Sequence, residues 1–494
     1  MLPKMPPSFH RIVWKIILLS LIPFLGTVSA TTIVVNSTLD AVATDGFCTL
    51  REAVQAANTN TAVNECLAGQ AFPTIDVIDL TGITGTITLG GTELAIVEAV
   101  NMNGPGPKSL SISANSQSRV LNVGAATNIS GIRVTGGFIS SGSGCGIFNS
   151  SALTLTDCAV DANTGNVVLG VGIFNSSAGT LIVDRSTISN NTAQSPDADI
   201  EVDGGGIYST GSLSAYNSTI AGNSVSAPVA FALGGGIYNG GNLSLLNCTV
   251  SNNTAGQGGG LYDFRANPST ANIANLIVSG NQGSSGPDDG LVGLGSQGSM
   301  TSGGHNLIGV AFTGNFTPGT ADQIGTGTAN LGPLQDNGGP TSTMELQAGS
   351  TAIDAGDDTI CGGPSINNVD QRGLARPQDG DNNGSAVCDI GAFEVQAQTS
   401  CLFCDEFDQP PTDWTVVKPS WDSSQVGFLK AVPVRKAIII ARPAFSGCLD
   451  CSVETSLQIG GGARNRVWML SQYIDKNNTM ELLLKQENSR IILK

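Results

Sequence analysis

The stretch GGGIYNGGNLSLLNCTVSNNTAGQGGG, from Gly234 to Gly260, is bounded by two glycine triplets and nearly repeats what precedes it. GGGIYSTGSLSAYNSTIAGNS begins thirty residues earlier, at Gly204, and GGGLY begins at Gly258. Self-similarity at a period of this length indicates a repeat architecture rather than an ordinary globular domain. The composition agrees, because Gly is abundant (64 residues) and only 12% of the chain is charged, which favours short strands and turns over long helices.

Five copies can be set in register by the strand-like segment that follows each corner. These segments are LTLTDCAVDANT from Leu153, LIVDRSTISNNT from Leu181, LSAYNSTIAGNS from Leu213, LSLLNCTVSNNT from Leu243 and ANIANLIVSGNQ from Ala271. The eighth position is always apolar: Val160, Ile188, Ile220, Val250 and Val278. Three residues later there is always an asparagine: Asn163, Asn191, Asn223, Asn253 and Asn281. Alternation of apolar and polar residues predicts half-buried strands, two or three in each copy.

A single copy cannot bury its own apolar face, whereas stacked copies bury all of them. Each strand then pairs in parallel with its equivalent in the next copy, about 4.8 Å away. Asparagine amides at that spacing can hydrogen-bond along the axis and satisfy turn backbone. The glycine triplets provide the positive φ of a sharp corner. We therefore predict an all-β chain built around a right-handed parallel β-helix.

The connection between each repeat asparagine and the next corner varies in length, and such insertions collect on one side of a solenoid. The connection after Thr192 carries four acids, Asp197, Asp199, Glu201 and Asp203. These acids indicate either a cation-binding or ligand-binding loop, or a loop that is merely solvated.

The register also separates two of the eleven cysteines. Cys158 and Cys248 fall in one column three coils apart, which is about 14 Å at the strand spacing and beyond disulfide reach. We predict that both are buried free thiols. Cys145, at a glycine corner, receives no assignment.

Residues 1–30 have the features of a secretory signal. Lys4, Arg11 and Lys15 form a basic head, an apolar run follows, and Val28-Ser29-Ala30 offers a cleavage site. The alternative is a buried N-terminal helix. Removal of the signal changes the net charge from −17 to 19 − 39 = −20, which disfavours nucleic acid as a partner. No later stretch is apolar enough to predict a transmembrane helix, and we expect a monomer.

Residues 31–100 are expected to cover the N-terminal end of the helix, where exposed sheet edges would otherwise promote aggregation. In FCTLREAVQAANTN, Thr49 and Glu52 form a capping box that predicts a short amphipathic helix over the first coil. We expect a Cys48–Cys66 disulfide to hold it. A second disulfide is predicted between Cys361 and Cys388.

Several motifs resemble a known group of exported bacterial proteins. CTLREAV, from Cys48, resembles the Cys-Ser-Leu-Arg-Glu-Ala motif of an N-terminal domain of such proteins, with Thr49 and Val54 as departures. GGHNLIG, LGPLQDNGGPTSTMEL, STAIDAGD, DQRGLARPQDGD and CDIGAFE, between Gly303 and Glu394, resemble the choice-of-anchor Q region. The repeats in residues 101–310 are also similar in style to those of polymorphic outer-membrane proteins. The resemblance implies a secreted or outer-surface β-helix protein, with residues 311–396 as a C-terminal cap, and it brings no catalytic residues.

Residues 397–494 differ in style and resemble, weakly, the start of a concanavalin-like β-sandwich, a fold often used to bind carbohydrate. The segment is short for such a sandwich, so a truncated chain is one interpretation. Cys401, Cys404, Cys448 and Cys451 form two Cys-x-x-Cys pairs. In an exported protein these predict two disulfides rather than a four-thiolate zinc site.

The stretch Asp379-Gly-Asp381-Asn-Asn383-Gly384 resembles the opening of a Ca²⁺-binding loop, with oxygen ligands at alternate residues. The twelfth position is Ile390, which cannot close the site, so Asp389, Asp370 or a carbonyl would have to do so. We predict a calcium site at Asp379, Asp381 and Asn383, with an ion-free turn as the alternative.

No catalytic constellation is evident. Lyases acting on acidic polysaccharides need an Arg or Lys base beside acidic ligands, and hydrolases need paired carboxylates. Residues 140–300 contain only Arg185 and Arg265 as cations, and His305 is expected to have a packing role in a turn. The sequence therefore favours an adhesin-like, structural or glycan-binding protein. The alternative is a polysaccharide lyase or glycoside hydrolase on the same scaffold.

Overall fold

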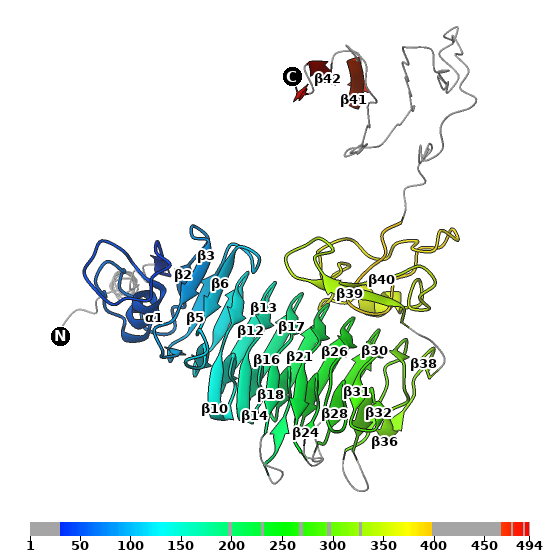
Figure 1. Ribbon diagram of the computed structural model, residues 1–494, viewed down its shortest axis with the longest axis horizontal. Coiled ribbons are helices and arrows are strands. Elements are labelled where there is room, and N and C mark those ends of the chain that lie inside the picture. Colours follow the sequence, from blue (N-terminus) through cyan, green and yellow to red (C-terminus); the bar gives the residue numbers. More distant parts are fainter. Residues whose placement is uncertain are drawn as a thin grey trace, which may run out of the picture. The chain divides into compact units, whose positions relative to one another are not determined.

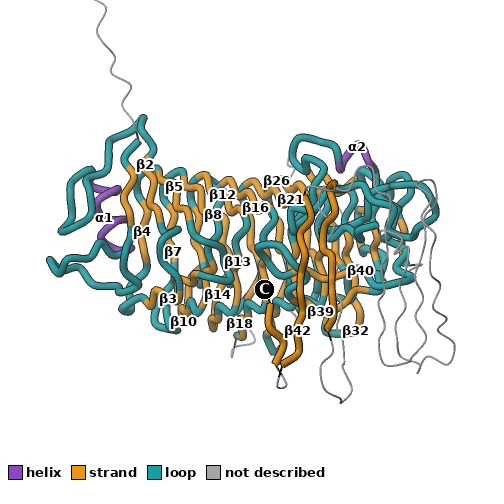
Figure 2. The backbone as a smooth tube through the Cα atoms, turned by 90° about the horizontal axis from the view of Figure 1, so that it is seen from above, coloured by secondary structure: helices purple, strands orange, loops and turns teal. Residues whose placement is uncertain are grey.

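The repeat forms a parallel β-solenoid in which successive coils add one strand to each of three parallel sheets (Figures 1 and 2). The computed structural model describes residues 30–195, 200–228, 232–265, 270–293, 298–325, 329–397, 466–475, 478–487 and 490–493. The chain divides into two units, residues 1–399 and 400–494. The fold class predicted from the sequence, an all-β parallel β-helix, is confirmed.

The three sheets are numbered 1 to 3 here, and along each coil the chain passes from sheet 1 to sheet 3 and then to sheet 2. Sheet 1 contains β1 (Thr32–Val34), β2 (Asp76–Asp79), β5 (Val100–Asn103), β8 (Thr127–Ser130), β12 (Ala152–Thr156), β16 (Thr180–Asp184), β21 (Ser212–Tyr216), β26 (Asn242–Leu246) and β29 (Ala271–Ala274). Sheet 2 contains β4 (Leu94–Ile96), β7 (Leu121–Val123), β11 (Ile147–Asn149), β15 (Ile173–Asn175), β20 (Ile207–Ser209), β25 (Ile237–Asn239), β28 (Leu261–Asp263), β33 (Gly290–Val292) and β36 (Thr313–Gly314). Sheet 3 contains β3 (Gly85–Thr88), β6 (Leu110–Ser113), β9 (Arg133–Thr135), β13 (Ala159–Asp161), β17 (Thr187–Ser189), β22 (Thr219–Ala221), β27 (Thr249–Ser251), β30 (Ile277–Ser279), β35 (Leu307–Ile308) and β38 (Gln323–Ile324).

The register follows the sequence alignment. Leu181 pairs with Leu213 in sheet 1, and Ile188 pairs with Ile220 in sheet 3. The inward residues of all three sheets form one continuous core that extends from Ile33 to Phe312. Periodicity thus determined which residues stack, because each equivalent position must occupy the same place in its coil.

The predicted asparagine ladder is present. In this column, Nδ2 of each asparagine donates to Oδ1 of the asparagine in the next coil. The four distances, from Asn163 through to Asn281, are 2.8, 2.9, 3.0 and 2.9 Å. The ladder ends at the buried Asp289, whose Oδ1 accepts from Nδ2 of Asn281 at 2.9 Å. All five amides are fully buried, and the ladder satisfies polar groups that would otherwise lack partners.

The glycine triplets serve two purposes, of which the sequence predicted one. Only the first residue of each triplet has positive φ, for example 65° at Gly204 and 67° at Gly234. The later residues are glycine because coils approach closely there. A Cβ atom on Gly206 would lie 2.6 Å from the carbonyl oxygen of Gly236.

A small cap covers the N-terminal end of the solenoid (Figure 1). Helix α1 (Leu50–Thr59) begins at the capping box of Thr49 and Glu52, as predicted. Arg51 donates from its guanidinium to the carbonyl oxygens of Thr92 and Glu93 and ties the helix to the second coil.

The described parts of the insertions form a fourth, shorter sheet beside the solenoid. It contains β10 (Phe138–Ser143), β14 (Thr164–Leu169), β18 (Thr192–Gln194) and β23 (Ser224–Ser226). A parallel pair, β19 (Val202–Asp203) and β24 (Ala232–Leu233), returns to the glycine corners. A second, small apolar core, which includes Cys145, Val171 and Val225, lies beneath. Asp203 is therefore buried in a strand, while Asp197 and Asp199 lie outside the described residues.

Residues 331–395, called the lateral segment below, do not close the C-terminal end of the solenoid as expected. They lie along its side, against the outer face of sheet 3 (Figures 1 and 2). Gln371 accepts a hydrogen bond from the hydroxyl of Thr219 at 2.6 Å, and Lys108 donates to Asp336 at 2.6 Å. The segment contains β39 (Leu331–Gln335), β40 (Thr343–Leu346) and helix α2 (Asp358–Cys361).

Short strands complete the C-terminal coils: β31 (Gln282–Gly283), β32 (Gly286–Pro287), β34 (Met300–Thr301) and β37 (Phe316–Thr317). In the second unit, the described residues form an antiparallel sheet of β41 (Arg466–Asp475), β42 (Asn478–Glu487) and β43 (Arg490–Leu493). The antiparallel strands agree with the sequence pattern. The rest of the predicted sandwich, including its four cysteines, lies outside the described residues, as do residues 1–29 of the predicted signal.

Candidate cation site

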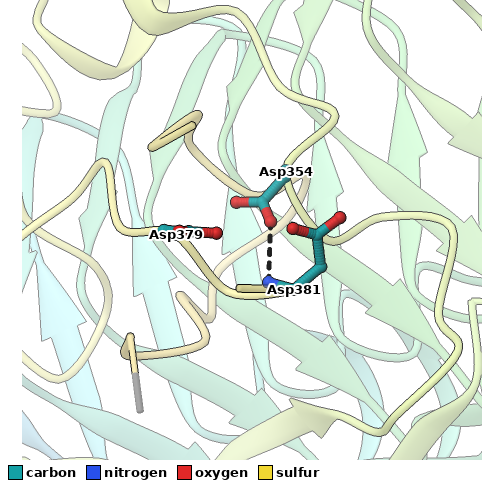
Figure 3. A group of neighbouring side chains, drawn as sticks. All are labelled: Asp354, Asp379 and Asp381. Atoms are coloured by element: carbon teal, nitrogen blue, oxygen red, sulfur yellow. Dashed lines mark hydrogen bonds between the residues drawn. The ribbon is translucent and has the colours of Figure 1, made fainter. Parts of the chain in front are cut away.

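Three carboxylates of the lateral segment converge on one point. One oxygen each from Asp354, Asp379 and Asp381 lie within 4.8 Å of one another (Figure 3). Asp379 and Asp381 come from the predicted calcium loop. Asp354 comes from the STAIDAGD stretch, 25 residues before Asp379, and the sequence analysis did not identify it because no local spacing connects the two.

Backbone hydrogen bonds hold the three acids in place. Asp379 accepts from the amides of Asn383 and Gly384, at 3.0 and 2.9 Å, which closes the turn. Asp354 accepts from the amides of Gly380 and Asp381, at 3.1 and 2.8 Å, and so joins its own turn to the loop. These backbone hydrogen bonds position the carboxylates of Asp354 and Asp379.

Asn383, the third predicted ligand, is used within the turn. Its Nδ2 donates to Asp381 at 2.9 Å, and its Oδ1 accepts from the amide of Ser385 at 2.9 Å. An ion held by Asn383 would compete with that second bond. The geometry therefore points to Asp354 as the third ligand.

The electrostatics of the cluster favour a cation. Burial raises the pKa of Asp354 above its usual range, and the charge of Asp381 adds to this, although backbone hydrogen bonds oppose it. A divalent ion would relieve the repulsion between the acids. Carboxylate oxygens suit Ca²⁺ or Mg²⁺, so the predicted Ca²⁺ stays a prediction with which this donor set is compatible.

A second group of buried acids in the lateral segment has raised pKa values, as catalytic acids often do, but their oxygens are engaged in hydrogen bonds within the fold. Burial raises the pKa of Asp389 to about 7 and that of Glu394 to about 8. Their oxygens accept from backbone amides, including those of Asp354 and Gln378, at 2.8 and 2.7 Å. Both are fully buried beside Arg376. These motif residues hold the lateral segment together and cannot reach a substrate.

Gln371 and Arg372, in the same DQRG motif, also have structural contacts. Gln371 Nε2 donates to the hydroxyls of Thr187 and Thr341, both at 2.9 Å. Arg372 pairs with Asp370 at 2.7 Å and its guanidinium lies 3.6 Å from the ring centroid of Phe393. The motif fastens the lateral segment to sheet 3.

The two cations of the repeat are both paired. Arg185 contacts Asp157 and Asp184 at 3.0 and 2.7 Å. Burial lowers its pKa, but these two acids outweigh that effect and raise it, so Arg185 is unsuited to act as a base. Arg265 is buried against Asp263 at 2.8 Å. His305 has positive φ and a 2.9 Å hydrogen bond between Nδ1 and the carbonyl of Ala355, which agrees with a role in a turn.

The cysteines follow the sequence predictions where they are described. Cys48 is bonded to Cys66 and Cys361 to Cys388, with Cα atoms 4.9 and 6.7 Å apart. Cys145, Cys158 and Cys248 are buried free thiols. Burial raises the pKa of all three to about 12, which keeps them protonated and unreactive.

Comparisons of the chain with protein families, with curated proteins and with solved structures give no match in any of the three. The architecture itself, a parallel β-solenoid, is therefore the class to which the structure assigns the chain. Within the described residues, no helix has both the length and the apolar character needed to cross a membrane.

Proposed function

We propose that this chain is an exported scaffold protein, secreted or displayed on a cell surface, in which the solenoid presents adhesive or glycan-binding surfaces. The observation that supports the proposal is that buried acidic side chains accept hydrogen bonds within the fold. Asp289, Asp370, Asp389 and Glu394 all accept backbone or amide hydrogen bonds inside the fold. Buried acids that hold the fold together in this way suit a protein for display rather than turnover.

Three further observations support export. The N-terminal sequence has the features of a secretory signal, two disulfides persist best in oxidising compartments, and the motifs resemble exported surface proteins. The test is expression with the native leader, followed by fractionation and N-terminal sequencing. We expect the mature chain outside the cytoplasm, beginning at residue 31. Retention of the intact leader in the cytoplasm would contradict export.

Adhesion and catalysis are separated by a second experiment. The full mature chain is applied to a glycan array and, in parallel, incubated with pectin, alginate and related acidic polysaccharides. We expect binding to a subset of glycans without release of shorter products. Turnover by the purified protein would replace the proposal with the lyase or hydrolase alternative. Sedimentation of the same sample tests the expected monomer.

We further propose that the candidate cation site holds Ca²⁺ and stabilises the lateral segment. The support is the convergence of Asp354, Asp379 and Asp381 from two separate turns, which a bound ion would cross-link. Millimolar extracellular calcium can fill even a weak site of this kind.

A further inference from the structure

A column of aromatic rings runs along the outer face of sheet 2. Phe148, Phe174, Tyr208, Tyr238 and Tyr262 stack one per coil, with centroids 5.2, 5.3, 4.5 and 5.4 Å apart, and Phe264 extends the column at 6.1 Å. The column arises at the glycine corners, where an inward aliphatic residue is followed by an outward aromatic one. Ile207, for example, is fully buried, whereas Tyr208 is partly exposed.

The ring faces in this column are already covered. Interplanar angles between 7° and 17° place each of the first five rings face to face with its neighbour. At the N-terminal end, the guanidinium of Arg119 lies 5.1 Å from the centroid of Phe148. A sugar ring needs a free aromatic face to stack on, so this column is not a glycan platform along most of its length. The edges of the rings, including the phenol groups, face outward.

Two adjacent tyrosines are distinguished from the rest. Tyr208 and Tyr238 are paired in register, with the shortest separation in the column, 4.5 Å, and an interplanar angle of 9°. Both rings are partly exposed. Tyr262 is farther from Tyr238, at 5.4 Å and 17°, and only 8% exposed. Of the three tyrosines in the column, Tyr208 and Tyr238 are therefore the most accessible to an oxidising enzyme.

We propose that Tyr208 and Tyr238 form an oxidative cross-linking site, joined through their ortho carbons by a haem peroxidase that uses hydrogen peroxide. Each phenol loses one electron and one proton, and the two radicals combine to form one carbon–carbon bond. The ortho hydrogens then move to the phenol oxygens and restore both rings. Hydrogen peroxide takes up the two electrons and two protons and leaves as two molecules of water.

The surroundings of the pair are consistent with this chemistry. Burial, together with the charges of Asp203 and Glu201, raises the pKa of Tyr208 to about 12, so the phenol is protonated at neutral pH. Each oxidation must then release a proton. Asp203 and Glu201 lie close enough to act electrostatically on the phenols of Tyr208 and Tyr238, and the released protons pass to solvent at the exposed edges of the rings.

The bond would connect neighbouring coils of the repeat, which neither disulfide does. Cys48–Cys66 lies in the N-terminal cap, and Cys361–Cys388 in the lateral segment. A link between residues 208 and 238 closes a loop of thirty residues. Such a link restricts the unfolded chain as a disulfide does and stabilises the fold.

The experiment uses the purified full chain at low concentration, treated with a haem peroxidase and hydrogen peroxide. We expect dityrosine fluorescence in the monomer fraction, a cross-linked peptide containing Tyr208 and Tyr238, and a higher thermal midpoint. Tyr208→Phe and Tyr238→Phe keep the ring stack but remove one phenol, and each should reduce that peptide more than tenfold. Tyr262→Phe is the matched control and should retain it.

Before oxidation, the thermal midpoints of the three variants should match the wild type, which shows that the stack is intact. Cross-links that map to Tyr216, Tyr262 or Tyr473, or that join two chains, would overturn the proposal. An unchanged yield in Tyr208→Phe, or consumption of tyrosine with no intramolecular link, would do the same. The reaction depends on the stack alone, so its failure does not bear on export or adhesion.

Discussion

Asn191 shows how much one side chain does in a stacked fold. Its Oδ1 accepts from the side chain and the amide of Asn163, at 2.8 and 3.2 Å. Its own amide and Nδ2 both donate to Asn223, at 3.1 and 2.9 Å. With the bond from Nδ2 to the carbonyl of Val160 at 3.0 Å, five hydrogen bonds therefore involve one fully buried residue. The column of five such asparagines connects five successive coils in one chain of polarised amides.

We predict that Asn191→Leu destabilises the protein by about 3 kcal/mol, because it leaves the backbone amide of Asn163 buried without a partner and removes the Nδ2 donor to Asn223 and to the carbonyl of Val160. Chemical unfolding of the first unit measures the loss. Asn128→Ala is the control, since Asn128 is exposed on sheet 1 and bonds only to the side chain of Asn101. Equal effects of the two substitutions would show that the ladder contributes nothing specific.

A second prediction concerns the glycine corners. Gly206→Ala should destabilise the protein by about 1–3 kcal/mol, because the new Cβ would lie 2.6 Å from the carbonyl oxygen of Gly236 and force the coils apart. Gly82→Ala has open space around it and should change stability by less than about 0.5 kcal/mol. Thermal unfolding of both variants makes the comparison. A neutral Gly206→Ala would mean that the corner can relax.

At the residue scale, the sequence predicted which side chains contact one another only at positions that recur in every repeat. It predicted the partners of Leu181 and Ile188 and the asparagine column. It also contained a signal for the aromatic column, since Tyr208, Tyr238 and Tyr262 each follow a glycine corner by the same spacing, but the alignment did not use that position. Asp354 had no such signal, because its contact with Asp379 depends on two unrelated turns.

Among the elements, the lateral segment departs most from expectation. It was expected at the end of the solenoid, yet its anchors are distributed along the side, from Lys108 to Asn275. Thr187, Thr219 and Thr249 point outward from sheet 3 and are nevertheless buried, because the segment covers them. The sequence contains one copy of this segment, so no periodicity could reveal which coils it contacts.

We predict that Ca²⁺ stabilises the lateral segment through its three acids. The thermal midpoint should rise when millimolar Ca²⁺ replaces chelator. At a Ca²⁺ concentration about five times the dissociation constant, the free energy of unfolding should increase by about 1 kcal/mol. Asp354→Asn and Asp381→Asn should lose the shift. Asp45→Asn, an exposed acid in the N-terminal cap, should retain it. If chelator moves no midpoint, or moves all four proteins equally, the loop is an ion-free turn.

Over the whole first unit, the balance of buried acids sets the response to pH. Asp203, Asp389 and Glu394 have pKa values raised to about 8, 7 and 8, and burial is the largest cause in each case. Burial also raises the pKa of Asp263 and Asp289. In the unfolded chain such groups ionise near pH 4. Between about pH 4 and pH 8, the folded state therefore binds more protons than the unfolded state.

The sign of the effect follows from linkage. A state that binds more protons is favoured at low pH, so these acids stabilise the fold below pH 4 and lose that contribution as the pH rises through their folded values. We predict that the free energy of unfolding decreases from pH 5 to pH 8. This is the opposite of a fold held by ionised, paired carboxylates, whose stability would increase over the same range.

Glu394→Gln provides the specific test of this pH dependence. Gln cannot ionise, so the decrease from pH 5 to pH 8 should be smaller than in the wild type, whatever the variant's stability at pH 5. Denaturant unfolding at four pH values across that range gives both profiles. The control is Glu65→Gln, which should keep the wild-type slope. Glu65 lies in the N-terminal cap, and its Oε1 accepts a hydrogen bond from the amide of Gly46 at 2.9 Å. A wild-type profile that rises with pH would show that Asp389 and Glu394 are ionised in the fold. The lateral segment would then be held by their charge pairing with Arg376 rather than by protonated, hydrogen-bonded acids.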